Sequence, residues 1–451
     1  MSIHKQLSDY SRELDECVRC GACQAQCPSY LAIGKEGAAA RGKIVLAAEV
    51  LAGRMELDEE GKRDLALCLL CGACARTCPN HVPTDAIVSA LRREISEKDG
   101  LSTIGKGVAA LTGNPRLLGT LVRGTKIFSS LLFRRIPETS GLRLRFSPQN
   151  LQDRVLPPLP RRNLFSRLPE RLQGKAGKAT LAFFAGCTIT YLYPEMGEAT
   201  ARLLNRLGYT VLIPRGQGCC GMPALSSGNG ALVEQLAHTN TAAFDTAAFP
   251  SEPIEHIITA CASCGGALTR FYGEMQTEAL HDFSGKVMDI HAFLKKEGCI
   301  DTLAALPKNS DRVKVCYHDP CHLKNHGITR EPRELLRALP TVDYVEMDGA
   351  ALCCGLGGTF SASQPGLSRA IADRKIAGLS ASGAELVASG CPGCIMQLND
   401  IIHRAGLPMR AVHTMNLALA ALEEGLSDTA ILHSGHPPCQ NTSVAPWATE
   451  S

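Results

Sequence analysis

Eighteen of the 21 cysteines stand at spacings typical of metal ligands. Two runs follow the pattern C-x2-C-x2-C-x3-C-P, in which one short segment can wrap three corners of an iron–sulfur cube. The fourth cysteine, followed by a proline that stops the turn, then points toward a neighbouring cube. The first run is Cys17, Cys20, Cys23 and Cys27, and the second is Cys68, Cys71, Cys74 and Cys78.

This spacing is that of a two-cluster ferredoxin, in which the last cysteine of each run binds the other run's cluster. A pair of zinc knuckles is the alternative, but zinc prefers two separated C-x2-C pairs to four crowded cysteines. We therefore expect two [4Fe–4S] clusters that exchange electrons. Their predicted ligands are Cys17, Cys20, Cys23 and Cys78 for one cluster, and Cys27, Cys68, Cys71 and Cys74 for the other.

Ten further cysteines form two longer blocks that repeat each other. The first block is Cys187, Cys219, Cys220, Cys261 and Cys264, and the second is Cys321, Cys353, Cys354, Cys391 and Cys394. The step from the first cysteine to the pair is 32 residues in both blocks, and the step from the pair to the C-x2-C is 41 in one and 37 in the other. This arithmetic predicts a duplication with one five-cysteine site in each repeat.

Each five-cysteine block needs a scaffold that brings its members together. Buried strands are expected at 180–186, 209–214, 256–260, 313–319, 342–347 and 384–389, with helical segments between them. Each repeat is therefore a β-α-β-α-β unit with a parallel sheet. Ligand sites in such sheets lie at the carboxyl ends of the strands, and all ten cysteines follow a strand end.

The segments around the two ferredoxin runs have helical periodicity instead. Ile44, Ala47 and Leu51 recur on one helical face, and Thr84 and Asp85 can begin a second helix. Nothing between the runs alternates as a strand would. The eight cysteines are therefore expected on tight turns between helices.

The composition narrows the class of protein. The 451 residues are 45% hydrophobic, and a net charge of +3 is too small to indicate a nucleic-acid partner. We find no secretory signal and no apolar run long enough to cross a membrane. Many thiols at ligand spacing suit a reducing cytoplasm, whereas a disulfide scaffold, the alternative, belongs to small secreted chains.

Residues 101–178 differ in charge from the rest, with fifteen Lys or Arg and three Asp or Glu. Within them a leucine-rich amphipathic segment carries Arg116, Arg123, Lys126, Arg134 and Arg135. Such a segment can lie on an anionic membrane surface or dock a partner, which would place the protein at the inner face of a membrane. The alternative is a linker helix that packs its apolar face on its own chain.

Three histidines, His318, His322 and His326, surround Cys321 in HDPCHLKNH. They could form a mixed metal site or a proton relay with the second cysteine block. The alternative is a neutral histidine that hydrogen-bonds the backbone beside the cysteines.

Three glycines, Gly216, Gly218 and Gly221, form a literal G-x-G-x-x-G after a strand. They overlap the Cys219–Cys220 pair, and no acidic residue follows at the distance that a dinucleotide site needs. We expect them to let the backbone approach a cluster, and we expect no cofactor site beyond the clusters.

The whole pattern resembles a known family. The chain resembles the iron–sulfur subunits of glycolate oxidase and D-lactate dehydrogenase, within the lactate-utilisation and heterodisulfide-reductase-like CCG-domain family. The resemblance lies in CVRCGACQAQCPSY, ARGKI and CLLCGACARTCP, in the doubled C-x(n)-C-C-G-x(n)-C-x2-C, and in CCGLGGTFSASQPGLS at 353–368. The resemblance implies an α + α/β fold, with an all-helical two-cluster ferredoxin domain followed by two duplicated α/β CCG domains. The expected segments are the ferredoxin domain at 1–100, a basic linker at 101–178, CCG domains at 179–310 and 311–425, and a tail at 426–451.

The resemblance also implies a division of labour. A separate FAD-containing subunit would oxidise a 2-hydroxy acid, D-lactate or glycolate, and this chain would pass the electrons toward a quinone or another acceptor. No catalytic residue for the hydroxy acid is therefore expected here. Each five-cysteine set has the capacity for one non-cubane [4Fe–4S] cluster, with zinc or an empty site as alternatives. A disulfide reductase that uses the CCG clusters as its reacting centre is the alternative function.

Overall fold

The computed structural model describes residues 4–127, 133–136, 141–144, 154–245, 253–275, 277–307 and 311–424. The predicted tail at 426–451 lies outside these residues. The N-terminal part is helical in its described residues, as the periodicity predicts. Its elements are η1 (Leu7–Tyr10), α1 (Ser11–Asp15), η2 (Gln24–Gln26), α2 (Pro28–Ile33), η3 (Glu36–Ala38), α3 (Ala40–Leu51), α4 (Glu59–Ala66), α5 (Ala73–Thr77) and α6 (Thr84–Asp99).

The two long helices of this part pack around one small core. α3 buries Ile44 and Ala47, and α6 buries Ile87 and Leu91 on the facing side. Because these residues are three or four positions apart, they lie on one face of each helix. Cysteines of both runs, Cys17, Cys68 and Cys78, pack against this same core.

The basic stretch continues as α7 (Thr103–Thr112) and α8 (Pro115–Ile127), followed by β1 (Phe133–Ile136) paired antiparallel with β2 (Gly141–Leu144). Gly119 of α8 lies against Tyr191 of the next unit, which supports packing on the chain itself. Leu117 and Leu121, one turn apart, remain exposed. The basic side chains predicted to accompany them, Arg116, Arg123, Lys126, Arg134 and Arg135, lie outside the described side chains.

The first α/β unit contains a five-stranded sheet in the order β3-β5-β4-β6-β7. β4, β5, β6 and β7 are parallel, and β3 pairs antiparallel with β5 at the edge. The strands are β3 (Arg171–Leu172), β4 (Thr180–Phe184), β5 (Thr210–Leu212), β6 (Ile254–Thr259) and β7 (Val287–Asp289). The helices are η6 (Leu164–Ser166), α10 (Gly186–Tyr191), α11 (Pro194–Arg206), α12 (Met222–Ser226), α13 (Gly230–Ala243), α14 (Ala262–Gly266), the π-helix η8 (Ala267–Phe271), α15 (Glu278–Lys286), α16 (Ile290–Lys296) and α17 (Cys299–Ala304).

The second α/β unit repeats this plan with a four-stranded sheet in the order β11-β10-β8-β9, parallel throughout. Its strands are β8 (Val313–Tyr317), β9 (Val342–Tyr344), β10 (Leu386–Ser389) and β11 (Arg410–His413). Its helices are α18 (Cys321–Asn325), α19 (Arg330–Ala338), α20 (Phe360–Ser363), α21 (Pro365–Asp373), α22 (Ile376–Ala381), α23 (Pro392–Arg404) and α24 (Thr414–Glu424). The duplicated α/β fold class is confirmed.

The two α/β units share a hydrophobic core. On β8, Val315 and Tyr317 point into the core that extends to the first unit, whereas Cys316 between them points into a second core on the opposite face. α24 packs against α11 of the first unit. The two sheets are therefore fixed relative to each other by apolar packing, and their strand ends can meet.

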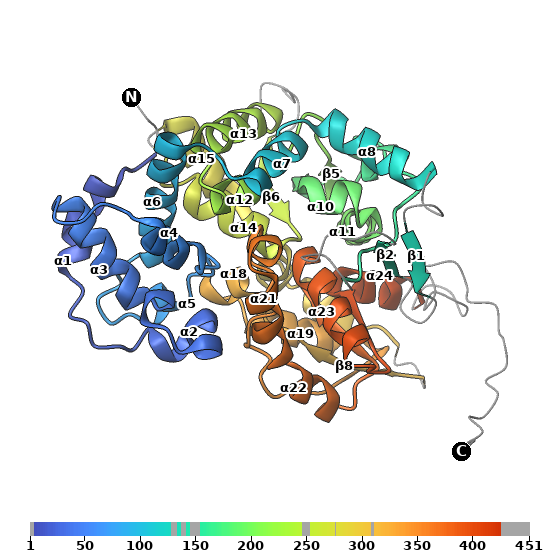
Figure 1. Cartoon of the computed structure of the whole chain (residues 1–451). Helices are drawn as coiled ribbons and strands as arrows, with labels where there is room; N and C mark the ends of the chain where they lie inside the picture. Colours follow the sequence, from blue (N-terminus) through green and yellow to red (C-terminus); the bar gives the residue numbers. More distant parts are fainter. Residues whose placement is uncertain are drawn as a thin grey trace, which may run out of the picture.

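The N-terminal helical unit lies against both α/β units, as Figure 1 shows in blue beside the green, yellow and orange parts. α2 contacts α21, α5 contacts α18, and α6 contacts α12. An ion pair between Asp85 of α6 and Arg270 of η8 joins the helical unit to the first α/β unit. Among the described residues, no helix has both the length and the apolar character to cross a membrane.

Candidate iron–sulfur and thiolate sites

The two ferredoxin runs adopt the same unusual turn. Arg19 and Leu70, each just before the second cysteine of its run, have positive φ values of 55° and 51°. Gly21 and Gly72, just after that cysteine, have φ values of 82° and 70°. Two left-handed positions flanking one cysteine are costly for ordinary residues and are typical of backbone that wraps a ligand.

The second predicted cluster has a cavity at its position. Four cysteines line one pocket of the structure: Cys27, Cys68, Cys71 and Cys74. Three of them come from the second run and one from the first, so the structure brings Cys27 beside the three cysteines with which the spacing groups it. Burial raises the pKa of Cys71 and Cys74, as it does for thiols that lie away from water.

The other predicted set lies nearer the surface. Cys20 is exposed, and Cys17 and Cys23 are half-buried. Burial, with the nearby Cys17 and Cys20, raises the pKa of Cys23. Cys17 and Cys78 pack on the same apolar core, and Asn80 donates a hydrogen bond to the carbonyl of Glu16, which ties the end of the second run to the start of the first. This set is the more accessible of the two.

A buried ammonium group lies beside the inner set. Lys43 is 1% exposed, and its Nζ donates hydrogen bonds to the carbonyls of Gly37 and Ala38. Burial lowers its pKa, and negative charge at Cys68 and Cys27 opposes that shift. An ammonium in this position needs a negative partner, which thiolates bound to a cluster would supply.

The first five-cysteine block comes together as one line of sulfur contacts. Cys187 Sγ and Cys219 Sγ are 3.5 Å apart, on α10 and in the loop after β5. Cys219 contacts Cys220, which contacts Cys264, and Cys264 contacts Cys261. All five cysteines expected at this site are therefore adjacent.

The second block repeats this order. Cys321 contacts Cys353, Cys353 contacts Cys354, and Cys354 Sγ lies 3.6 Å from Cys394 Sγ. Cys394 in turn contacts Cys391. The repeat visible in the sequence is thus a repeat in the geometry.

The two blocks also touch each other, which the sequence did not indicate. Cys261 of the first block contacts Cys391 of the second. Beside them the Ala262 amide donates to the Gly390 carbonyl at 3.1 Å, and Ser263 Oγ lies 3.7 Å from Cys391 Sγ. All ten sulfurs therefore form one continuous line that is symmetric about this central contact.

The glycine of each C-C-G turn has a direct structural role. Gly221 and Gly355 have φ values of 87° and 85°, which favour glycine, and a Cβ on Gly355 would lie 2.4 Å from the Ser368 carbonyl oxygen. In each pair, the turn lets the second cysteine accept hydrogen bonds from neighbouring thiols. Hydrogen bonds from Cys219 and Cys264 lower the pKa of Cys220 to about 5, and the pKa of Cys354 is lowered in the same way.

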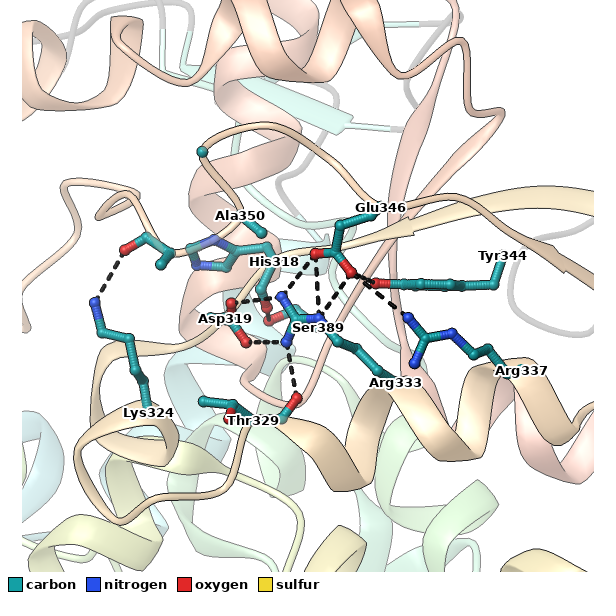
Figure 2. A network of polar contacts seen from close by, with 12 residues as sticks. His318, Asp319, Lys324, Thr329, Arg333, Arg337, Tyr344, Glu346, Ala350 and Ser389 are labelled. Atoms are coloured by element: carbon teal, nitrogen blue, oxygen red, sulfur yellow. Dashed lines mark hydrogen bonds and ion pairs between the residues drawn. The ribbon is translucent and has the colours of Figure 1, made fainter.

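A polar network fixes the loop that leads to Cys321 (Figure 2). Arg333 donates to both oxygens of Asp319 at 2.7 and 2.8 Å, and to Glu346 at 2.8–3.1 Å. Tyr344 donates to Glu346 at 2.6 Å. Because the Asp319 side chain is only 5% exposed, this bidentate pair compensates a buried carboxylate two residues before a cysteine of the site.

The three histidines of this loop have different surroundings. His322 places its Nε2 3.3 Å from the Leu70 carbonyl, at the contact with the helical unit. His318 is the one that the structure places beside the sulfurs, with a ring nitrogen within 4.8 Å of Cys354 Sγ and Cys394 Sγ. Burial, with the charge of Lys375, lowers the pKa of His318 well below its ordinary value. His326 shows no such contact with the sulfurs among the described residues.

Lys375 is a second buried ammonium beside cysteines. It is 1% exposed and donates hydrogen bonds to the carbonyls of Gly349 and Ala350 at 2.8 and 3.2 Å. Burial lowers its pKa, and the cysteines of the second block, first Cys354 and then Cys353, oppose that shift. As at Lys43, the donor set and the buried cation together fit a negatively charged metal–thiolate centre.

The inner ferredoxin set and the second block are neighbours. Cys71 and Cys353 both pack against a small apolar cluster of Leu69, Phe360 and Ile371. Asn325 of α18 donates a hydrogen bond to the Cys71 carbonyl across the same contact. The predicted redox sites therefore follow one another from the exposed Cys20 to the first five-cysteine block.

Comparison with known proteins identifies the family. Residues 13–82 match the model of a 4Fe-4S dicluster domain, and residues 181–269 and 315–399 both match that of a cysteine-rich domain, CCG. The chain is 31% identical to a probable glycolate oxidase iron-sulfur subunit of Bacillus subtilis, over 91% of this chain and 94% of the relative. The chain belongs to the CCG/4Fe–4S dicluster family. It is an iron–sulfur protein of an oxidoreductase family.

Other relatives of this CCG/4Fe–4S dicluster protein carry different names. It is 30% identical to a subunit of the dihydromethanophenazine:CoB–CoM heterodisulfide reductase of Methanosarcina acetivorans, over 86% of this chain and 89% of the relative. It is also 29% identical to lactate utilization protein A of Geobacillus kaustophilus, over 52% of this chain and 95% of the relative. The family is thus established, and its members carry the names of different enzymes.

Proposed function

We propose that this CCG/4Fe–4S dicluster protein is the electron-transfer subunit of a flavin-dependent 2-hydroxy acid dehydrogenase, of the D-lactate or glycolate type. A partner subunit would oxidise the hydroxy acid on FAD, and this chain would accept the electrons singly and pass them toward a quinone or another acceptor. The names of two relatives, a probable glycolate oxidase iron-sulfur subunit and a lactate utilization protein, support this substrate class.

One observation supports the proposal: the predicted ligand sets lie next to one another in a row. The row begins at the exposed Cys20, continues through the inner set to Cys71, and reaches the ten-sulfur line by way of Cys353. Iron–sulfur clusters supply reversible one-electron chemistry where they are bound. The residues of this chain would hold them in sequence, balance their charge with Lys43 and Lys375, and keep water from the inner sites.

The same proposal assigns ligands and segments. The eight ferredoxin cysteines would hold two [4Fe–4S] clusters in the crossed sets of the spacing, and each five-cysteine set would hold a further non-cubane cluster or zinc. The segments would be 1–100, 101–178, 179–310, 311–425 and 426–451. The protein would work in the cytoplasm, with the exposed Leu117 and Leu121 of α8 available for peripheral contact with the inner face of the membrane.

The experiment that tests this function is a pulldown of the tagged chain from cells grown on lactate or on glycolate, under anaerobic conditions. We expect a FAD-containing partner and reduction of the chain's clusters when the matching hydroxy acid is added. Recovery of the loaded chain with no flavoprotein, and no reduction by either acid, would refute the proposal.

A second candidate function is favoured by the Cys261–Cys391 contact, which joins the two five-cysteine sets into one centre. Such a centre could reduce a disulfide substrate, and the heterodisulfide reductase name of one relative supports this class. The isolated, reconstituted chain would then turn over a disulfide with a one-electron donor. Absence of turnover by a chain whose metal content shows loaded sites would remove this candidate.

A further inference from the structure

The two repeats differ in one residue that lies against the sulfurs. Three positions before the first cysteine, the first repeat has Phe184 and the second has His318. Both side chains are fully buried at the carboxyl end of an inner strand of their sheet, since Phe184 ends β4 and His318 directly follows β8. A duplicated scaffold thus places an apolar ring in one site and an imidazole in the other.

The two rings face equivalent cysteines. A Cβ built on Gly186 would lie 3.0 Å from Cys264 Sγ and 3.2 Å from the Phe184 ring, so the ring and the last cysteine of its block both lie beside Gly186. In the second repeat, a His318 ring nitrogen lies within 4.8 Å of Cys394 Sγ, the equivalent cysteine, and of Cys354 Sγ. The imidazole therefore lies close enough to these two sulfurs to bind the same metal centre as they do.

The His318 ring lacks the polar partners that other buried histidines have. Among the described residues, neither its Nδ1 nor its Nε2 makes a hydrogen bond of ordinary geometry, although the Ala350 backbone lies close enough to raise the pKa of the ring. By contrast, His291 is held by Asp289 and Thr414 at 2.8 and 2.7 Å. A buried polar group without a well-formed hydrogen bond is destabilising, so this ring can take a partner that the protein itself does not contain.

The backbone around His318 is held firmly. Its amide donates to the Ala388 carbonyl at 2.9 Å, and Ser389 Oγ donates to its carbonyl at 3.3 Å. The next residue, Asp319, is fixed by the bidentate contact with Arg333 (Figure 2). The ring therefore points at the sulfurs from a rigid strand end, which is how first ligands of metal centres are supported.

We propose that His318 supplies a nitrogen ligand to the metal centre of the second five-cysteine set, which is then a mixed sulfur–nitrogen site, whereas the first set is all sulfur. This inference needs one part of the proposed function, namely that the second five-cysteine set binds a metal. A neutral imidazole adds no negative charge to the centre, and where it takes the place of one of the five thiolates on iron it raises the reduction potential. The two duplicated sites would then differ in potential.

The test uses the full-length protein purified without oxygen, with histidine labelled by ¹⁵N in one preparation and unlabelled in the other. Metal content shows whether the second site is loaded. If the site holds iron, pulsed EPR measures the hyperfine coupling between the iron centre and the histidine nitrogen. If it holds zinc, X-ray absorption measures the distances from zinc to its ligands, which are about 2.0 Å for nitrogen and about 2.3 Å for sulfur. The variants are His318→Phe, which copies the first repeat, and His322→Asn, a control in the same loop whose ring bonds Leu70 instead.

We expect a directly bonded histidine nitrogen in the unmodified protein, its loss in His318→Phe, and its retention in His322→Asn, with the ferredoxin signals unchanged in all three. A loaded second site without a histidine nitrogen, or a coupling that survives in His318→Phe, would overturn the ligand while leaving the proposed function intact. A second set that binds neither iron nor zinc would overturn both the ligand and the loading on which it rests. The measurement on the unmodified protein decides the question even if His318→Phe does not fold.

Discussion

Replacement of Arg333 by methionine tests the network that supports the second five-cysteine site. Arg333 is 16% exposed and holds Asp319, which is 5% exposed, through two hydrogen bonds of 2.7 and 2.8 Å. Arg333→Met leaves that carboxylate buried without its cation, which costs about 3–5 kcal/mol. Glu346, the other partner, is 51% exposed, so its lost contact adds about 1 kcal/mol or less.

The matched control is Arg337→Met on the same helix. Arg337 is 55% exposed and lies 3.9 Å from Glu346, so its removal should change the free energy of unfolding by less than about 1 kcal/mol. A double variant, Asp319→Asn with Arg333→Met, removes the unpaired charge and should recover part of the loss.

The assay is anaerobic urea unfolding of the three variants and the unmodified protein, followed by circular dichroism and by cluster absorbance. With a common slope, the shift in midpoint gives the change in free energy. We expect Arg333→Met to lose stability and to release metal from the second site first, because Asp319 is two residues from Cys321. A loss for Arg333→Met that is no larger than that for Arg337→Met would refute the reasoning.

Three further predictions follow from buried or exposed groups. Lys375→Met removes an ammonium beside the second block, so we expect the reduction potential of that site to fall and its metal to be lost more readily. Redox titration and metal analysis measure these two effects. A gain in stability with unchanged metal content would mean that the cysteines there carry no charge. His413 has its pKa lowered to about 4 from an ordinary 6.5, chiefly by burial, so the stability it provides is full above pH 6.5 and is lost as the pH falls toward 4. We expect a loss of about 2 kcal/mol between pH 7 and pH 5 that His413→Gln does not show in urea unfolding; equal losses in both proteins would contradict this. Finally, changing the exposed Leu117 and Leu121 of α8 to glutamate should abolish flotation with anionic liposomes. The control, Ile33→Glu on the exposed face of α2, should still float. If the unmodified protein does not float, the proposed contact of α8 with the membrane is wrong.

Much of the fold could be predicted because the cysteines mark the ends of strands. β4, β6, β8 and β10 are apolar runs that stop within a few residues of a cysteine, and both features are local in the sequence. The short strands β7 and β11 were not expected, because no cysteine follows closely behind them to mark a strand end in the sequence. β3 was not expected either, since its two residues become a strand only through pairing with β5.

The candidate site was predicted in its parts but not in its assembly. Spacing groups the cysteines within each block, yet the Cys261–Cys391 contact depends on how the two sheets pack. That packing uses α24 on α11 and the bond between His413 and the Ala260 carbonyl, contacts between residues far apart in the chain. Lys375 gave no sequence signal, because a lysine is ordinarily exposed and only its burial makes it informative.

The histidines show the same limit. The pattern HDPCHLKNH indicated that a ring could serve the second site, but it could not separate His318 from His322. The separation arises because His318 lies at a buried strand end and His322 lies on α18, which faces the helical unit. Only the direction of each side chain, set by tertiary packing, decides which of them meets the sulfurs.

The most direct test of the whole account is the number of iron, sulfide and zinc atoms per chain after anaerobic purification, together with EPR of the reduced and oxidised states. Two conventional clusters alone would give about eight iron atoms. Metal at the ten-sulfur line predicts more than about eight iron atoms, or about eight with zinc in addition; because zinc carries no electrons, only iron there extends the row of redox sites. About eight iron atoms with no further iron or zinc would mean that the ten-sulfur line holds no metal, and would contradict the account.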